Sequence, residues 1–446
     1  PSVAQIFKSC PIATSASTSQ SGGLIRLVYS SDSNIWVWDE GQDPIALVRA
    51  EVVNQVLLTE DGRTIVFTQQ VGQGPGEIWA VGVDGENLRQ LAGGVEITGG
   101  LEAIDFSWDG QLIAFSHKVD DNNSELWVAR MDGSGFYRLV STEDLKAIFN
   151  DFENPQGVIP FSVRWIPGTH QLLYDAYPTG DGIFIYVQDQ VWTVDADTRE
   201  KRNLLGSGVG GSISFSPNGE VMAIVSQDRL QLMFVGGIQP RQINIPYYAI
   251  GFGEYYFYPA MVWSPDSAFL LLALPYTNQG TQDEPVAIWQ VSVDGSAPTR
   301  LAEFSGFAPS FQFSPDLSRV AYWRAEPQFN DRDLHLANVD GSEDVHYVTS
   351  FVLEFLSWAA DSQQFAYSYE QSGTRITLLG DICAEPQKLT DYHAFPTWLG
   401  GGRLLLLHEQ DGRLILSLVK NSGEIKPLIH PEDYDNYAFI VLQAND

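Results

Sequence analysis

A repeat of about 49 residues runs through the chain and constrains its fold more than any other feature. Each copy places an apolar or aromatic residue before a turn of Ser-Pro-Asp-Gly type, and an apolar segment follows the turn. The marker positions are Leu58, Phe106, Trp165, Phe215, Trp263, Phe313, Trp358 and Trp398. Self-similarity at this spacing is typical of an array in which one supersecondary unit recurs.

Each copy has the pattern of four short antiparallel strands. Pro fixes φ early in the turn and Asp bonds nearby backbone, so segments 264–266 and 314–316 are predicted hairpin turns. The third strand carries a tryptophan in several copies, as at Trp79 and Trp127, and an Asp-Gly turn then reverses the chain. Such a sheet cannot bury both faces alone, so successive sheets must pack face against face.

Eight complete modules begin near residues 53, 103, 162, 212, 260, 309, 354 and 395. A ninth is split, with three strands at 24–30, 34–39 and 45–48 and its missing strand at 437–442. The sequence therefore predicts an all-β fold, a single β-propeller over residues 24–446, with nine four-stranded blades and a ring closed by the N- and C-terminal strands. An eight-bladed ring is the alternative, if the split module does not join. Residues 1–23 are expected to form a tail or linker.

One helix is predicted inside the array, at residues 141–149. Ser141 precedes Asp144 at the spacing of a capping box, in which side chain and backbone satisfy each other at a helix start. The segment falls between the fourth strand of one module and the first strand of the next.

The composition argues against several classes of partner. The chain has 25 Lys and Arg against 56 Asp and Glu, a formal net charge of −31. This charge would repel a phosphate backbone, so we expect no nucleic-acid partner. The apolar runs fall far short of the roughly 20 residues that a spanning helix needs, so we expect no membrane span.

Known catalytic and cofactor motifs are not found. The Gly-x-Ser-x-Gly elbow of serine hydrolases does not occur, and neither does the Gly-Lys dipeptide of a P-loop. Residues 206–211 match Gly-x-Gly-x-x-Gly but join two predicted strands, whereas a dinucleotide site needs a helix N-terminus there. The expectation is a protein that is not an enzyme and has no cofactor.

The Ser-Pro-Asp-Gly hairpins and Val-Asp-Gly turns resemble the WD-type repeats of TolB-like propellers and of the propeller domain of prolyl oligopeptidase relatives. The resemblance covers nearly all of residues 24–443. It implies a periplasmic, cell-surface or secreted protein that docks other proteins or peptides. This chain departs from TolB in having more modules and no separate N-terminal domain, so no partner can be carried over.

An aromatic segment at residues 246–259 is the strongest candidate for a binding surface. Amphipathic rings in a connection between modules can anchor a protein interface or stack on a sugar. Its rings are Tyr247, Tyr248, Phe252, Tyr255, Tyr256, Phe257 and Tyr258. The leading hypothesis is an extracytoplasmic scaffold that binds a protein or peptide there. The alternatives are a propeller that binds or cleaves polysaccharide, a structural subunit of a surface assembly, and rings that simply belong to the core.

Two smaller sets of residues complete the predictions. The only cysteines, Cys10 and Cys383, can reach each other along an extended tail, and a bridge between them would fit an oxidising compartment. The alternative is two independent thiols. His393, His408 and His430 fall near one rim of neighbouring sheets, which makes them candidate metal ligands. The favoured alternative is that they are ordinary solvated loop histidines.

Overall fold

The computed structural model describes residues 24–442 with internal gaps. The residues outside the description within that range are 71, 73–74, 98–103, 150–154, 180–189, 207–210, 227–228, 236, 238–239, 249, 253–254, 277–283, 326–330, 400–401, 411–412, 420–423 and 429–435. The predicted tail therefore lies outside the described residues.

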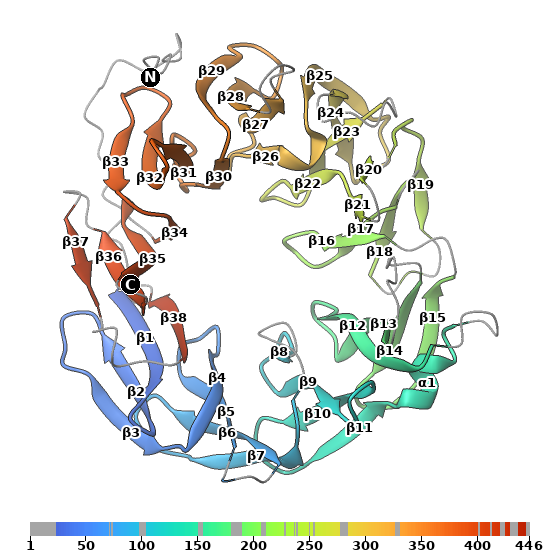
Figure 1. The fold of residues 1–446 in the computed structure, drawn as a ribbon. Helices are drawn as coiled ribbons and strands as arrows, with labels where there is room; N and C mark the ends of the chain where they lie inside the picture. The colour runs from blue at the N-terminus through green and yellow to red at the C-terminus, as the bar shows by residue number, and fades with distance from the viewer. Residues whose placement is uncertain are drawn as a thin grey trace. The chain divides into compact units, whose positions relative to one another are not determined.

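Within the described residues the fold is all-β (Figure 1). Nine four-stranded antiparallel sheets are present, each with the strand order of a propeller blade, and one two-stranded hairpin accompanies them. The predicted fold class and the count of nine blades are confirmed. In the part of the chain that the structure describes, helical structure is confined to α1 (Thr142–Lys146) and the 3-10 turn η2 (Ala308–Ser310). No helix in the described part of the chain has the length and apolar character to cross a membrane.

The chain divides into two compact units. One comprises residues 23–211 and 432–446 and contains four sheets, and we call it the four-sheet unit. Its strands are β38 (Asn436–Leu442), β1 (Leu24–Ser31), β2 (Asn34–Asp39) and β3 (Ile45–Arg49); β4 (Val52–Leu58), β5 (Thr64–Gln70), β6 (Gly76–Gly82) and β7 (Arg89–Val95); β8 (Ile104–Phe106), β9 (Leu112–Lys118), β10 (Ser124–Arg130) and β11 (Phe136–Val140); β12 (Gly157–Trp165), β13 (Gln171–Thr179), β14 (Val191–Asp195) and β15 (Lys201–Leu205).

The two ends of the described chain share one sheet in this unit. Strand β38 pairs antiparallel with β1, and the register runs from Leu24 opposite Leu442 to Ser30 opposite Asn436. The prediction that residues 437–442 supply the missing strand of the split module is confirmed. Pairing also covers an edge of β1 that would otherwise be open to other chains.

The second unit contains the described residues from Ser212 to Leu428, and we call it the five-sheet unit. Its strands are β16 (Ser212–Phe215), β17 (Val221–Val225), β18 (Leu230–Phe234) and β19 (Arg241–Ile243); the hairpin β20 (Ile250–Phe252) and β21 (Tyr255–Phe257); β22 (Ala260–Trp263), β23 (Phe269–Pro275), β24 (Glu284–Ser292) and β25 (Thr299–Gly306); β26 (Gln312–Phe313), β27 (Arg319–Ala325), β28 (Arg332–Asn338) and β29 (Val345–Ser350); β30 (Leu353–Trp358), β31 (Gln364–Gln371), β32 (Thr374–Asp381) and β33 (Gln387–Thr390); β34 (Ala394–Trp398), β35 (Leu404–Gln410), β36 (Arg413–Val419) and β37 (Ile425–Pro427).

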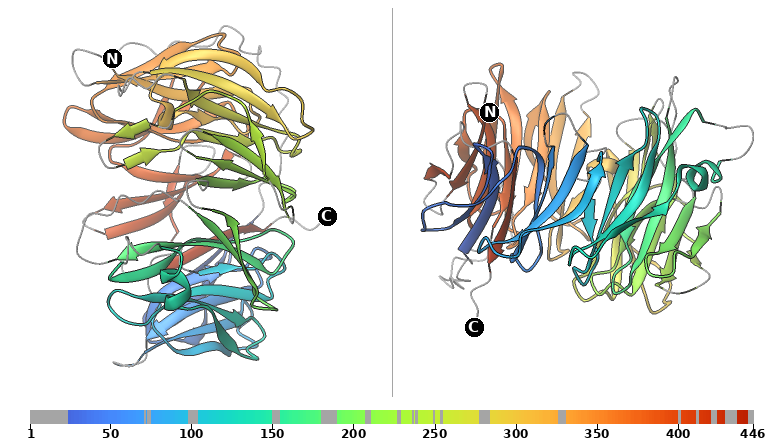
Figure 2. Two further views of the ribbon diagram at one scale, coloured as in Figure 1. Left: turned by 90° about the vertical axis from the view of Figure 1, so that its right-hand side faces the viewer. Right: turned by 90° about the horizontal axis from the view of Figure 1, so that it is seen from below.

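Each sheet has two distinct ends, because its strands follow one another as an antiparallel meander. The first-to-second and third-to-fourth turns lie at one end, which we call the short-turn end. The second-to-third turn and the connection to the next sheet lie at the other, the long-connection end. Figure 2 shows the twist of the individual sheets, which has the usual origin in backbone sterics.

The turns at the short-turn end are held by the chemistry that the repeat predicted. Ser264 Oγ donates to Asp266 Oδ1 at 2.7 Å, and the same oxygen accepts the Ala268 backbone N–H at 3.1 Å. The last residue of the turn has a positive φ. In the turn at 107–110 this residue is Gly110, whereas in the turn at 264–267 it is Ser267, with a φ of +61°. The Asp and Ser hydrogen bonds hold this left-handed residue although it has a Cβ.

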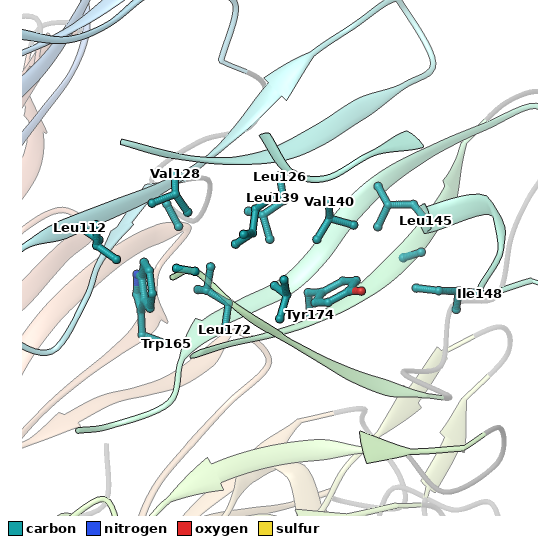
Figure 3. Packing of buried hydrophobic residues seen from close by; sticks show 14 of the residues in the cluster. Leu112, Leu126, Val128, Leu139, Val140, Leu145, Ile148, Trp165, Leu172 and Tyr174 are labelled. Atoms are coloured by element: carbon teal, nitrogen blue, oxygen red, sulfur yellow. The ribbon is translucent and has the colours of Figure 1, made fainter. Parts of the chain in front are cut away.

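Neighbouring sheets within a unit pack through large apolar clusters. In the four-sheet unit, Leu126 and Val128 of β10 pack against Leu172 and Tyr174 of β13, with Trp165 in the same cluster (Figure 3). All five are buried. Burial of each such side chain contributes about 1.5 to 3 kcal/mol, so pairs of sheets stabilise each other where a single sheet could not.

The repeated tryptophan of the third strand has a polar partner two residues earlier. Trp79 Nε1 donates to Glu77 Oε2 at 2.8 Å, and Trp127 Nε1 donates to Glu125 Oε2 at 3.3 Å. The buried Glu125 also accepts from Arg138 at 3.0 Å. The indole is thus fixed by a short-range hydrogen bond that the apolar pattern alone did not predict.

The predicted capping box is confirmed, on a shorter helix than expected. Ser141 Oγ accepts the Asp144 backbone N–H at 3.2 Å, and Asp144 Oδ2 accepts the Ser141 N–H at 2.9 Å. Lys201 of β15 pairs with Asp144 at 2.6 Å. The helix therefore ties the connection after β11 to the outer strand of the next sheet.

Candidate functional site

The aromatic segment begins with a residue that belongs to the core. Tyr247 is 4% exposed, its hydroxyl donates to the Ser226 backbone oxygen at 2.9 Å, and it packs in the cluster between sheets β16–β19 and β22–β25. The next residue, Tyr248, is 49% exposed, and its backbone N–H donates to the Pro275 oxygen at 2.9 Å. Of the two adjacent tyrosines, Tyr247 is thus a core residue and Tyr248 a surface residue. A ligand at the surface would not reach the ring of Tyr247.

The rest of the segment forms a hairpin, where the sequence predicted only a connection. Strands β20 and β21 pair antiparallel, with Phe252 opposite Tyr255 and Gly251 opposite Tyr256. The side chains of Phe252, Tyr255, Tyr256 and Phe257 lie outside the described residues, and Tyr258 is half-buried. Their predicted role as a binding platform stays a prediction.

Exposed aromatic residues recur where one sheet of the five-sheet unit passes to the next. Tyr248 lies between β19 and β22, Phe351 lies between β29 and β30 and is 63% exposed, and Phe395 is the second residue of β34 and is 54% exposed. We call these three the connection aromatics. They lie at the long-connection ends of their sheets, and only Tyr248 was among the predicted binding residues.

Phe395 lies beside a group of polar side chains: Glu354 and Arg375 come from the sheet β30–β33, and His393 comes from the connection that leads to β34. Arg375 of β32 reaches across β31, where its Nε donates to Ser368 Oγ at 3.2 Å, and pairs with Glu354 of β30. His393 Nε2 lies 3.9 Å from Glu354 Oε2, and its ring meets Phe395 edge-on at 4.5 Å between centroids. We call Glu354, Arg375, His393 and Phe395 the Glu354 cluster.

The backbone around His393 is fixed by Thr377, which is fully buried on β32. Its Oγ1 accepts the Ala394 N–H at 3.0 Å and donates to the Tyr392 oxygen at 3.0 Å. One hydroxyl therefore holds the residues on both sides of His393. Glu354, Arg375 and Phe395 lie on strands, and His393 lies in a connection that Thr377 holds in place, which favours a defined geometry.

The surroundings of His393 favour the neutral form of its imidazole. Burial lowers the pKa of His393, and Arg375 lowers it further, while Glu354 acts in the opposite direction. Its Nδ1 is buried and has no hydrogen-bond partner among the described residues. A charged ring would leave a buried N–H unpaired, which agrees with the lowered pKa.

His408 has different neighbours from His393. It pairs with Ala394 across β34 and β35, stacks on Tyr392 at 4.7 Å, and its Nε2 lies 3.0 Å from Ser417 Oγ. Burial lowers the pKa of His408 as well. It is thus a packing residue of its sheet.

The predicted metal site remains a prediction. In the described part of the chain, no three His, Cys, Asp or Glu side chains come together as metal ligands. His430, the third predicted ligand, lies outside that part. His393 and His408 alone do not make a metal site.

Cys383 lies in the turn between β32 and β33, as predicted, and its N–H donates to Asp381 Oδ1 at 2.7 Å. The described residues contain no free cysteine. Cys10 lies outside them, so the bridge between Cys10 and Cys383 stays a prediction.

Comparisons with known proteins were made for sequence and for structure. No protein-family model matches the sequence, and neither does any curated protein. Among solved structures, the periplasmic gluconolactonase PpgL of Pseudomonas aeruginosa is similar at 15% identity, over 74% of this chain and 96% of that chain, with a TM-score of 0.38. Dipeptidyl peptidase 4 of Porphyromonas gingivalis is similar at 12% identity, over 92% and 58%, with a TM-score of 0.46.

TolB of Acinetobacter baumannii is similar at 13% identity, over 74% of this chain and 65% of that chain, with a TM-score of 0.27. At such identities a likeness concerns the fold and does not carry over activity or ligands. TolB and other propeller proteins are thus among the structural neighbours, and membership of a particular repeat family is not shown.

Proposed function

We propose that this protein is a propeller scaffold that docks a protein or peptide at the long-connection end of its five-sheet unit. The recurrence of the connection aromatics supports the proposal. Three large rings at comparable positions of separate sheets, each about half-exposed or more, leave apolar area in water where the turn itself requires none. Aromatic residues are enriched among the side chains that dominate binding energy at protein interfaces.

The proposal includes an extracytoplasmic location. Its support is the absence of a free thiol among the described residues together with the predicted bridge of Cys383. Alkylation of the denatured, unreduced protein tests this part directly. A bridged protein takes up no label, whereas two labelled cysteines would contradict both the bridge and the argument for an oxidising compartment.

The docking proposal is tested with a variant of Tyr248→Ser and Phe351→Ser. Immobilised wild-type protein is exposed to an envelope extract of the source organism, and proteins retained by the wild type but not by the variant are purified and titrated individually. A direct partner should bind wild type and lose roughly 2 kcal/mol for each ring removed.

Phe234→Ser is the matched control, because Phe234 is 61% exposed in the same unit but lies at the short-turn end. It should bind the partner as the wild type does. If the control and the double variant lose the partner equally, or if neither loses it, the long-connection end is not the docking surface.

A further inference from the structure

The Glu354 cluster has more hydrogen-bonding capacity than the fold uses. Arg375 donates one N–H to Ser368 and one to Glu354, and Glu354 accepts through one carboxylate oxygen. Neither side chain has another hydrogen-bond partner among the described residues. Arg375 is 33% exposed and Glu354 is 45% exposed. Guanidinium donors and a carboxylate acceptor therefore remain available side by side at the surface.

The charges of the cluster select against ionic ligands. Arg375 and Glu354 neutralise each other, and burial, which lowers the pKa of His393, favours its uncharged form. A cation would meet the guanidinium, and an anion would meet the carboxylate and a chain with a net charge of −31. A neutral ligand is repelled neither by the guanidinium nor by the carboxylate.

The ligand must also match the pattern of donors and acceptors. A hydroxyl group can donate to the carboxylate of Glu354 and accept from the guanidinium of Arg375 at the same time. Neighbouring hydroxyls on a sugar ring present this combination repeatedly. The pairing of Arg375 with Ser368 and Glu354 fixes the guanidinium in advance, so little ordering is needed on binding.

Phe395 supplies the remaining element, an apolar surface that His393 links to the polar pair. Its ring is held edge-on by His393 and remains more than half exposed on β34. The C–H face of a pyranose is apolar, whereas its rim carries hydroxyls. His393 contacts both Phe395 and Glu354, so an apolar ring and a polar pair that suit the two parts of a sugar are joined through one residue.

We propose that the Glu354 cluster is a binding site for a neutral saccharide. Arg375 and Glu354 bond the hydroxyl groups, and Phe395 packs against the ring. His393 positions Phe395. The site shares Phe395 with the connection aromatics. The docking variant changes only Tyr248 and Phe351 and leaves the Glu354 cluster intact, so failure of one proposal can be told from failure of the other.

The test is calorimetric titration of the intact chain with neutral oligosaccharides, namely maltotetraose, cellotetraose, mannotetraose, xylotetraose and chitotetraose. At least one should bind saturably. Arg375→Lys keeps the charge but loses the planar donor pair, and Phe395→Ser removes the apolar surface, so each should weaken binding about tenfold or more. Thermal unfolding of both variants should match the wild type, which shows that binding and not folding has changed.

Phe351→Ser serves as the control, because it removes a connection aromatic outside the cluster and should leave saccharide affinity unchanged. The proposal is overturned if none of the five oligosaccharides binds, or if binding is equal in the wild type and both cluster variants. A panel of uncharged, acidic and basic peptides is titrated in parallel. Saturable peptide binding that disappears in Phe395→Ser, without saccharide binding, would make the cluster a peptide site and also overturn the proposal.

Discussion

His170 Nε2 lies 3.0 Å from Asp109 Oδ2 and thereby joins the short-turn ends of two neighbouring sheets in the four-sheet unit. Its other ring nitrogen lies 2.8 Å from Asp197 Oδ2 in the turn between β14 and β15. The hydrogen bond to Asp109 is the largest cause of a raised pKa for His170, and Asp197 adds to it, against a smaller effect of burial. One imidazolium thus holds two carboxylates from separate turns.

Replacing His170 by Asn should remove a stabilisation that exists only while the ring is charged. Because the folded state raises the pKa, this stabilisation is complete below the ordinary pKa of about 6.5 and is lost as pH rises through the raised value. Solvent screens the pair, so the loss at pH 5 should be at most about 1 kcal/mol. Urea unfolding of wild type and variant at pH 5 and pH 9 measures it. Equal differences at both pH values would contradict the assignment.

Asp197→Asn is the matched partner for that experiment. The Asp197 carboxylate bonds His170, whereas Asp109 also accepts from Ser107 and Gln111 in its own turn. If Asp197 acts only through His170, the double variant should be hardly less stable than the His170 variant alone. Additive losses would show that they stabilise the fold separately.

His408 should give the opposite pH dependence. Burial lowers its pKa in the folded state, so stability is complete above about pH 6.5 and falls as pH drops toward the lowered value. His408→Gln keeps a polar group near Ser417 but cannot titrate, so its unfolding midpoint should fall less between pH 7 and pH 4.5. A parallel decline in both proteins would place the acid sensitivity elsewhere.

Trp165 should stabilise the fold in two ways that two substitutions can separate, a hydrogen bond and the packing of its ring. Its Nε1 donates to the Asp105 backbone oxygen of the preceding sheet at 3.1 Å, and its ring is buried. Trp165→Phe removes the hydrogen bond and should cost about 1 kcal/mol, whereas Trp165→Ala also leaves a cavity and should cost about 3 to 5 kcal/mol. Denaturant unfolding gives both values. Trp108→Ala, at an exposed turn position, should change stability by less than about 0.5 kcal/mol.

A single methyl group should disturb the sheet β30–β33. A Cβ at Gly380 would overlap the ring of Phe365, which is fully buried. Gly380→Ala should therefore cost about 1 to 3 kcal/mol through overpacking. Phe365→Leu in the same chain should recover part of that loss, and a double variant that is simply the sum of two losses would argue against a clash.

The repeat predicts most of the fold because local turn chemistry and burial agree with each other. The Ser and Asp of a turn such as Ser264–Asp266 act within a few residues, so their pattern is readable from the sequence alone. The same reasoning assigned residues 437–442 to the split module. It also predicted Ser141 as a helix cap, although α1 ends earlier than expected.

The candidate site could be predicted only in small part. Tyr247 and Tyr248 look equivalent in the sequence, and only the packing against Ser226 separates a core ring from an exposed one. Glu354, Arg375 and His393 occupy different positions in two repeats, so no spacing rule brings them together. Phe351 and Phe395 share a position that the sequence does show, because each lies at the start of a module. Their exposure, which marks them as surface rings, is known only from the structure.

The pairing of β1 with β38 has a consequence for synthesis on the ribosome. Strand β1 is synthesised long before its partner β38, because Leu24 pairs with Leu442. During translation β1 is left with one neighbour while the intervening sheets are made. Truncation just before β38 should therefore leave that strand available to a chaperone or to a second nascent chain, and a peptide of residues 436–442 supplied in trans should compete for the vacancy.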